Sequence, residues 1–397
     1  MERIKWAASA AQARETVVFR ASQLAEQRAA GVPVGDLGKG IGAQVALARR
    51  ESPSHAARLV GLAEALVCEM PATMAALTAG TISEWRATLV ARETACLSRE
   101  DRREVDARVG GRLATMSDKQ VLREARKHAY ELDPQSVVAR GRRAVADRRV
   151  TIRPAPDTMA VVSALLPAAQ GVAVYAALTG DADSKRAHGD DRSRGQVMAD
   201  TLVERVTGQT KADQTPVEVR LVMTDRTLLA GDQIPARLDG YGPIPAPAAR
   251  ALIRDLDPDT KAWLRRLFLD PCTGLLTAMD PKRRLFKHAL RRAVVIRDEY
   301  CRTPWCGAPI RHIDHVIPAE DGGVTSETNG QGLCEACNHA KQAPGWRSRP
   351  GPGGAGDSVT ITTPTGHAYT SRPPPLPGAP PEQHSRKPSR IDVYWAA

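Results

Sequence analysis

The sequence predicts a mainly helical N-terminal region, a small α+β part in the middle, a C-terminal module held by a metal ion, and an irregular tail. Alanine, arginine and leucine are plentiful while aromatic residues make up 4% of the chain, which favours helices packed through small aliphatic side chains. The pattern changes near Arg149, and four of the seven cysteines form two close pairs after residue 300. With 397 residues and 42% hydrophobic content, the chain can bury cores in about two or three domains.

Residues 1–148 are predicted to form the helical region. Ser54 can cap a helix that carries an apolar stripe at helical spacing, formed by Leu59, Leu62, Ala63 and Leu66. Ser117 and Gln120 have the spacing of a capping box, so another helix is expected to follow them. The stretch 44–67 resembles a helix-turn-helix, and a hairpin of bundle helices is the alternative that we favour.

Residues 149–280 are predicted to continue this domain as an α+β part. Two strand-like pieces, 150–152 and 159–165, are separated by a turn that contains Pro154 and Pro156. Pro167 is expected to open a helix that runs to about Leu178. The segment 179–195 is rich in Asp, Gly and Ser, and is therefore predicted to be a loop.

The chain is basic, with a formal charge of +11 and a sequence pI near 9.5, so polyphosphate partners are favoured. Its longest largely apolar stretch, 159–178, is interrupted by Ser163, Pro167 and Gln170, which argues against a membrane span. The N-terminus lacks the layout of a secretory signal. We therefore expect a cytoplasmic protein that does not associate with membranes.

Cysteine spacing is the most informative feature of the C-terminal part. Cys301 and Cys306 form one pair, and Cys334 and Cys337 form the other. In a reducing compartment such pairs bind metal more often than they form disulfides. Four thiolates can complete a tetrahedral zinc site, which would be closed and structural because no position is left for water.

A strand, a loop, an extended segment and a short helix are expected around these pairs, and their residues resemble a known family. Asp314 and His315, then Asn329, and then Cys334-Glu-Ala-Cys337-Asn338-His-Ala-Lys341 are similar to the HNH endonuclease family of the ββα-metal superfamily, in its zinc-bound subtype. The resemblance covers about residues 285–346, within a module that we place at 281–349. The rest of the chain is similar to a helical domain of unknown function that precedes HNH modules in repeated-element proteins of actinobacteria, which suggests a mobile element.

The resemblance implies metal-dependent hydrolysis of phosphodiester bonds that leaves a 5′-phosphate and a 3′-hydroxyl. His315 is the expected general base, since histidine titrates near neutral pH. Asp314 would be a ligand of a catalytic Mg²⁺ or similar divalent ion. Asn329 is expected to brace a loop through backbone hydrogen bonds, and Lys341 to meet a phosphate.

Two departures from the family pattern leave alternatives open. The last family position is often His, and here Asn338 stands next to His339; either could be the last metal ligand, and the spacing to Lys341 favours Asn338. In addition, adjacent residues on a regular strand point to opposite faces. Asp314 and His315 can therefore serve one phosphate only if the strand is bent or bulged there.

The segment 282–297 contains seven Lys or Arg residues and no acidic residue. A solvated helix face is one interpretation, and a phosphate track in front of the nuclease is the other. The second interpretation assigns nucleic-acid contacts to Arg283, Arg284, Arg291 and Arg292. Residues 350–397 are predicted to be a mostly irregular, Pro/Gly-rich tail with one strand-like piece at 359–363.

The leading functional hypothesis is an HNH endonuclease that acts on DNA, with RNA as the alternative substrate. It would use a structural Zn²⁺ and a catalytic Mg²⁺ or another divalent ion. A zinc-stabilised nucleic-acid-binding protein with a decayed nuclease site is the first competing hypothesis. A scaffold formed by the N-terminal helices, with a vestigial nuclease module, is the second.

Overall fold

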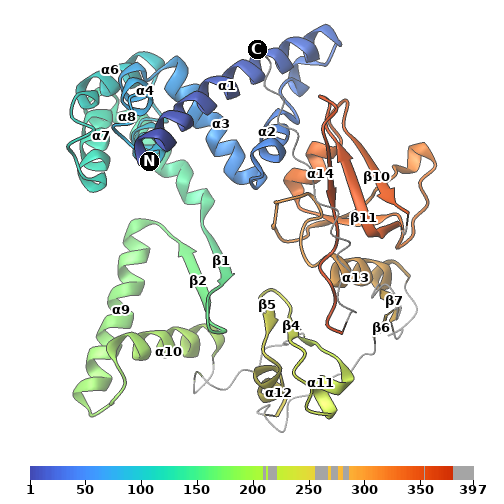
Figure 1. The fold of residues 1–397 in the computed structure, drawn as a ribbon. Coiled ribbons are helices and arrows are strands. Elements are labelled where there is room, and N and C mark those ends of the chain that lie inside the picture. The colour runs from blue at the N-terminus through green and yellow to red at the C-terminus, as the bar shows by residue number, and fades with distance from the viewer. Residues whose placement is uncertain are drawn as a thin grey trace. The chain divides into compact units, whose positions relative to one another are not determined.

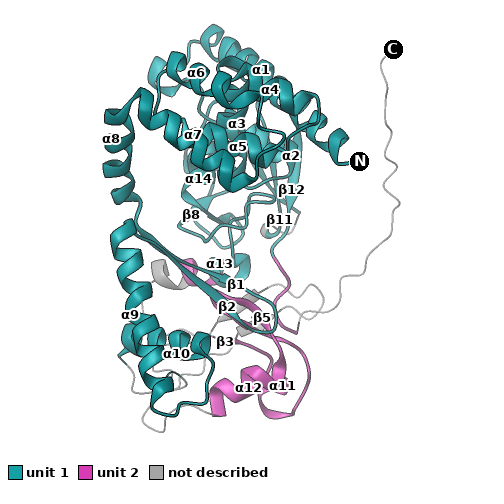
Figure 2. Ribbon diagram, turned by 90° about the vertical axis from the view of Figure 1, so that its left-hand side faces the viewer, with its two compact units in different colours: residues 1–216, 294–373 teal, residues 217–293, 374–397 magenta. Residues whose placement is uncertain are grey.

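The protein is described by a computed structural model that covers residues 1–208, 212, 221–254, 267–269, 276–279, 286–352 and 354–378. Contacts divide the chain into two compact units, which are coloured separately in Figure 2. The first unit contains residues 1–216 and 294–373, and the second contains residues 217–293 and 374–397. The domain boundaries proposed from the sequence, after residues 148, 280 and 349, stay predictions.

The N-terminal region is helical, as the sequence predicted (Figure 1). The elements are α1 (Glu2–Ala29), η1 (Val34–Asp36), α2 (Ile41–Arg49), α3 (Pro53–Cys68), α4 (Pro71–Thr78), α5 (Glu84–Glu93), α6 (Arg99–Gly110), α7 (Asp118–Leu132), α8 (Pro134–Ala144) and η2 (Val145–Asp147). Small and aliphatic side chains from α1 and α3 to α7 form one buried core, in which Leu66, Val90 and Val105 are nearly or fully inaccessible. No single described helix is long and apolar enough to span a membrane, although the bent pair α3 and α4 meets that test by length and composition.

Side chains at the helix starts explain several of these boundaries. Ser117 and Gln120 form the predicted capping box at α7. Helix α3 is capped by Ser52 rather than by Ser54, because Pro53 takes the first helical position, where its missing N–H costs nothing. Helix α4 has no side-chain cap of its own, and the buried carboxylate of Asp106 accepts hydrogen bonds from its first backbone amides instead.

A hairpin and two helices follow. Strands β1 (Arg149–Pro154) and β2 (Ala160–Leu165) pair in antiparallel fashion, as predicted. Helix α9 (Ala168–Ala187) runs well beyond the predicted end, so the loop expected at 179–195 is confined to the few residues before α10 (Arg194–Thr207).

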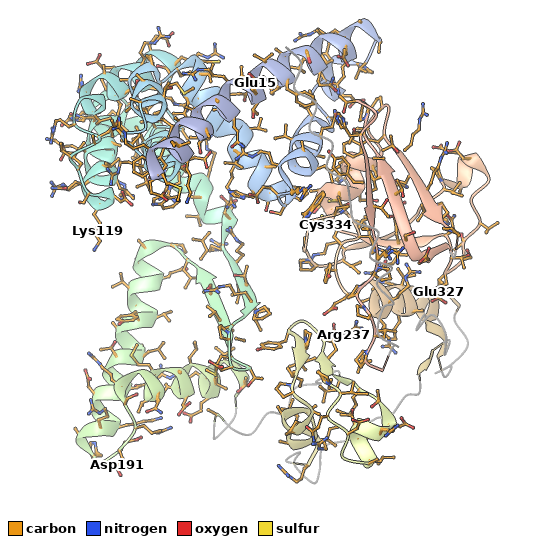
Figure 3. The ribbon with its side chains drawn as sticks, viewed as in Figure 1. Glu15, Lys119, Asp191, Arg237, Glu327 and Cys334 are labelled. Carbon is orange, nitrogen blue, oxygen red and sulfur yellow. The ribbon has the colours of Figure 1, made fainter. Side chains whose placement is uncertain are left out.

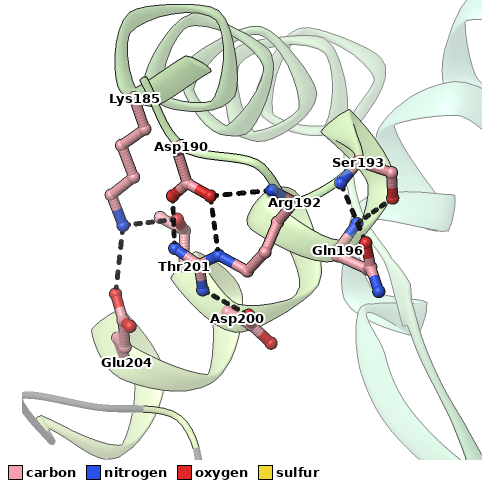
Figure 4. Close-up of polar contacts among 8 residues, drawn as sticks. All are labelled: Lys185, Asp190, Arg192, Ser193, Gln196, Asp200, Thr201 and Glu204. Carbon is pink, nitrogen blue, oxygen red and sulfur yellow. Dashed lines mark hydrogen bonds and ion pairs between the residues drawn. The ribbon is translucent and has the colours of Figure 1, made fainter. Parts of the chain in front are cut away.

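Ion pairs between α9 and α10 explain why α9 extends beyond its predicted end. The acidic residues that suggested a loop are paired with arginines of α10: Asp181 with Arg205, and Asp183 with Arg194 at 3.0 Å. Between the helices, Arg192 bonds to Asp190 and Asp200, and Ser193 forms a capping box with Gln196 (Figure 4). The Asp190 carboxylate is stabilised by Arg192, which lowers the pKa of Asp190 to about 2.

The second unit contains a three-stranded antiparallel sheet in the order β3 (Leu221–Val222), β4 (Ala236–Leu238) and β5 (Gly242–Ile244). Helices α11 (Asp225–Leu229) and α12 (Ala246–Arg254) accompany it, and a separate pair joins β6 (Leu267–Leu269) with β7 (Leu276–Met279). Helix α13 (Phe286–Asp298) begins in this unit and ends in the first one.

The C-terminal part of the first unit contains β8 (His312–His315), η3 (Ala319–Asp321), β9 (Gly330–Leu333) and α14 (Glu335–Lys341). A three-stranded sheet follows, formed by β10 (Arg347–Gly351), β11 (Gly354–Thr362) and β12 (Ala368–Ser371). This sheet confirms the strand-like piece predicted at 359–363 and corrects the prediction of irregular chain for the other residues of 350–371. Proline and glycine suggested irregular chain, but Val359 and Ile361 alternate with polar residues and are buried against Val316. Residues 379–397 lie outside the described part of the chain.

Candidate metal centre and nuclease site

The four paired cysteines gather at one place in the structure. Cys301 and Cys306 belong to the loop after α13, while Cys334 and Cys337 belong to the start of α14, where Cys334 is labelled in Figure 3. All four are buried, and their sulfurs lie within 4.8 Å of one another. Sγ of Cys306 is 3.6 Å from Sγ of Cys334 and 3.7 Å from Sγ of Cys337. Sulfurs bound to tetrahedral zinc at about 2.3 Å are separated by about 3.8 Å, so the cluster fits this ion.

Thiolate formation is favoured at two of these positions. The hydrogen bond with Cys306 lowers the pKa of Cys301 to about 7. Hydrogen bonds from the other three cysteines, with Cys301 first, lower the pKa of Cys334. Cys334 is also the N-cap of α14 and accepts the backbone N–H of Cys337 at 3.4 Å, a position where a helix stabilises negative charge. The pKa values of Cys306 and Cys337 are raised, first of all by their hydrogen bonds to Cys301.

Asp314 and His315 end strand β8 and have different partners. Oδ2 of Asp314 accepts from the Lys341 ammonium at 2.6 Å, while Nε2 of His315 lies 2.8 Å from Oγ1 of Thr325. The pairing of β8 with β9 continues to His315 opposite Gly330 without a register shift. The strand therefore contains no bulge, and the chain bends directly after it, at residues 316–317. That a bent strand end brings both side chains to one phosphate stays a prediction.

Asn329 is 94% buried and holds the loop between β8 and β9. Its Nδ2 donates to the carbonyls of Ile317 and Val324, both at 3.0 Å, and its Oδ1 accepts from the N–H of Ile317 at 2.8 Å. These bonds use the whole amide and are the contacts that a bracing role requires. A direct contact with substrate would have to break them.

Helix α14 presents the remaining candidates. Oδ1 of Asn338 is buried and has no hydrogen-bond partner among the described residues, whereas His339 is exposed and lies 4.0 Å from Glu335. Burying an acceptor oxygen without a hydrogen-bond donor costs free energy unless a ligand or a water binds it. This favours Asn338 over His339 as the last metal ligand. Lys341 is engaged within the protein, because its ammonium also donates to the carbonyl of His315 at 2.5 Å. A phosphate would have to share this ammonium with Asp314.

The basic segment 282–297 is only partly described. Arg291 and Arg292 are exposed on α13, while Arg283 and Arg284 lie outside the described residues. Arg297, the last arginine of the segment, is not available to a phosphate because it is 97% buried. The assignment of these arginines to nucleic-acid binding stays a prediction.

A buried charge cluster escaped the sequence analysis. The carboxylate of Asp298 accepts from Arg297 at 2.7 Å, from Arg302 at 2.9 Å and from the N–H of Gly332 at 2.7 Å. Arg297 also donates to the carbonyl of Gly330, and Arg302 to that of Ser371. The cluster thus joins α13, the first cysteine loop, β9 and β12. Arginine and aspartate next to each other in a sequence usually indicate a solvated surface, so only the partners distant in sequence could have revealed it.

Two antiparallel strands, β8 and β9, and the helix α14 form a ββα module, and the four-cysteine cluster joins the loop before β8 to the start of α14. The family model described as "HNH endonuclease" matches residues 299–343. The model described as "Domain of unknown function (DUF222)" matches residues 4–298, which is most of the chain, so the chain belongs to this family. Both resemblances recognised in the sequence are confirmed.

Searches among curated proteins and among solved structures found no match.

Proposed function

We propose that this protein is a metal-dependent HNH endonuclease that cleaves phosphodiester bonds in DNA. The observation that supports it most is the joint placement of Asp314 and His315 at the end of β8 and of the unpartnered Asn338 amide oxygen on α14, within an HNH domain. The four-thiolate cluster would hold a structural Zn²⁺ that fixes α14 against the first cysteine loop. Asp314 and Asn338 would hold a catalytic divalent ion.

The side chains can divide the chemistry between them. Nε2 of His315 forms a hydrogen bond with the hydroxyl of Thr325. Nδ1 would therefore be the nitrogen that accepts the proton of an attacking water. Lys341 occupies Oδ2 of Asp314, which leaves Oδ1 for the ion. When bound, the divalent ion would neutralise charge on the phosphoryl oxygens and on the leaving oxygen. Asn329 keeps the loop that carries Thr325 in place through its bonds to Ile317 and Val324.

The ion pair between Lys341 and Asp314 favours a second candidate function. An ammonium that already neutralises Asp314 weakens its attraction for a divalent ion. In that case the protein would be a zinc-stabilised nucleic-acid-binding protein without cleavage. The two candidates differ in whether added metal ions produce strand breaks.

Nicking of supercoiled plasmid with Mg²⁺ or Mn²⁺ tests the proposal. His315→Ala should reduce cleavage by about a hundredfold or more, the scale of positioned proton transfer. Asp314→Ala should also abolish cleavage, and a higher concentration of Mg²⁺ or Mn²⁺ should restore part of it, because only the metal ligand is missing. His312→Ala is the matched control, since His312 is exposed on the same strand.

Comparison of Asn338→Ala with His339→Ala identifies the last ligand. Asn338→Ala should show a milder loss that metal restores, and His339→Ala should cleave normally. Equal cleavage by the wild type, His315→Ala and Asp314→Ala would mean that the activity comes from elsewhere. Binding without metal-dependent nicking by the wild type would establish the second candidate instead.

A further inference from the structure

We propose that residues 140–153, an exposed arginine-rich segment that we call the basic arm, bind the phosphate backbone of a nucleic acid. This inference deepens the proposed function, because it assigns the surface with which the nuclease would hold its substrate. It is tested by binding alone, so its failure can be told apart from a failure of the cleavage mechanism.

The basic arm has a high density of charge and is exposed to solvent from residue 141 onward. It contains six arginines and one acidic residue, Asp147. Residues 141–150 are all exposed, and helix α8, which begins the arm, contributes no buried residue. The helix leads from the helical region into β1 (Figure 1). A stretch of this kind has no packing reason for its arginines.

The arginines of the arm lack the partners that other surface arginines have. Arg142, Arg143, Arg148 and Arg153 form no ion pair with any described residue. In the helical region, by contrast, exposed arginines such as Arg99, Arg123 and Arg126 pair with glutamates at 3.0 to 3.6 Å. Unpaired guanidinium groups repel one another and attract polyanions, and their planar N–H donors match phosphate oxygens.

These charges follow the chain from the last turn of α8 into β1. Arg142 and Arg143 lie in the last turn of α8, where the helix dipole favours cations even without a ligand. That effect does not extend to β1, where Arg149, Thr151 and Arg153 alternate on one face of the hairpin, with Thr151 opposite Ser163. Leu165 and Val161 of β2 lie opposite Arg149 and Arg153 on the same face, so the basic charge of this face comes from β1 alone. A two-stranded ribbon is narrow enough to enter the major groove of a duplex.

The opposite face of the hairpin carries Val150, Ile152 and Val162, which are more than half exposed. Nothing in the described residues shows what covers this face, and the proposal does not use it. The basic segment 282–297 is a weaker candidate for the same role, because Arg297 is buried in the charge cluster around Asp298.

Binding of a fluorescent DNA duplex over a range of salt concentrations tests the proposal. His315→Ala without added Mg²⁺ is the reference protein, so that cleavage does not interfere. Changing Arg142, Arg143, Arg148 and Arg153 together to Gln should weaken binding by more than about tenfold. It should also reduce the slope of log affinity against log salt by up to about four, since each of the four lost phosphate contacts removes about one released counterion. The corresponding Lys variant keeps the charges and should retain most of the slope.

The matched control changes Arg99, Arg112, Arg123 and Arg126 to Gln. It removes the same number of charges from exposed, ion-paired positions, where each pair contributes little to stability. This control should keep the affinity and the slope of the reference protein. An equal loss in both Gln variants would overturn the proposal, because net charge alone would then explain binding.

Three further results would also overturn it. These are unchanged binding by the arm variant, a loss of helical circular dichroism that accounts for its weaker binding, and arm-dependent binding to phosphatidylserine vesicles but not to nucleic acid. Parallel measurements with single-stranded DNA and duplex RNA identify the preferred form. If the arm variant loses binding while the wild type never cleaves DNA, the arm proposal stands and the nuclease proposal fails.

Discussion

At the scale of single residues, the contact between His315 and Thr325 is the most specific feature of the candidate site. The 2.8 Å contact to Nε2 fixes the imidazole ring, and an exposed loop supplies the partner. In the proposed mechanism Thr325 acts through His315, so it is a positioning residue.

Thr325→Val should therefore lower cleavage by about tenfold, because the ring of His315 loses its orientation while its chemistry is unchanged. Thr325→Ser should restore most of the activity, since the serine hydroxyl can make the same bond. Plasmid nicking measures both variants, and DNA affinity should not change. Full activity of the Val variant would show that His315 does not need this partner.

Glu327 gives a prediction for the pH dependence of stability. Burial raises the pKa of the Glu327 carboxyl, although Arg297 acts in the opposite direction. The folded state therefore holds this proton more tightly than the unfolded chain does. Its stabilising effect is complete below the unfolded pKa and is lost as the pH rises through the folded pKa, so ionised Glu327 costs stability at neutral pH.

Glu327→Gln should accordingly increase the free energy of unfolding at pH 8, and the gain should shrink as the pH is lowered toward 5. Urea denaturation at several pH values measures this difference. Glu320→Gln is the control, because Glu320 is exposed in the same loop, and it should show little change at any pH. A gain for Glu327→Gln that is independent of pH would contradict the assigned cause.

At the scale of elements, the predicted zinc site and the sheet after it can be tested separately. Changing Cys334 and Cys337 together to Ser should reduce the zinc content from about one ion per chain to none. Serine at position 334 can still cap α14, so the loss of zinc would be caused by the missing thiolates and not by a disrupted helix start. Cys68→Ser should keep its zinc, because Cys68 is exposed on α3, far along the sequence from the cluster. Metal analysis decides between these outcomes.

The sheet β10–β12 should be necessary for the nuclease module. A stop after Pro350 removes Val359 and Ile361, which are buried against Val316, and the carbonyl of Ser371, which accepts from Arg302 at 3.1 Å. Burial of two such side chains contributes about 3–6 kcal/mol, so the shortened module should lose zinc and become sensitive to protease. A stop after Gly378 keeps every one of these contacts and should behave as the full chain. Equal resistance of both truncations would show that the sheet is dispensable.

The sequence allowed the local elements to be predicted better than their partners. The capping box of Ser117, the β1–β2 hairpin and the cysteine spacing depend on residues close in sequence, and the structure contains all three. The end of α9 was missed because the carboxylates of Asp181 and Asp183 are paired with a helix that comes later. The Asp298 cluster was missed for the same reason, since Gly332 and Ser371 are distant in sequence.

At the scale of the whole molecule, the helical region and the metal-binding module belong to one compact unit. Gln44 of α2 accepts a hydrogen bond from Thr365 at 3.1 Å, and the guanidinium of Arg50 lies 5.8 Å from the ring centre of Trp305. Gly40, at the start of α2, lies so close to Trp346 that a Cβ there would be 2.6 Å from Nε1 of the indole. We therefore expect the two parts to unfold together.

Gly40→Ala should weaken this association for two reasons that a matched variant can separate. Gly40 has a φ of +80°, where an L-residue costs about 1–2 kcal/mol, and its new methyl group would also displace Trp346. Gly31→Ala has only the cost of the positive φ, because Gly31 has a φ of +73° and a Cβ there would meet no neighbouring atom. Calorimetry should show one transition for the wild type and a modest decrease in Tm for Gly31→Ala. For Gly40→Ala it should show a larger decrease, with a separate transition for the metal-binding module. Equal effects of the two substitutions would mean that the contact with Trp346 does not couple the helical region to the nuclease module.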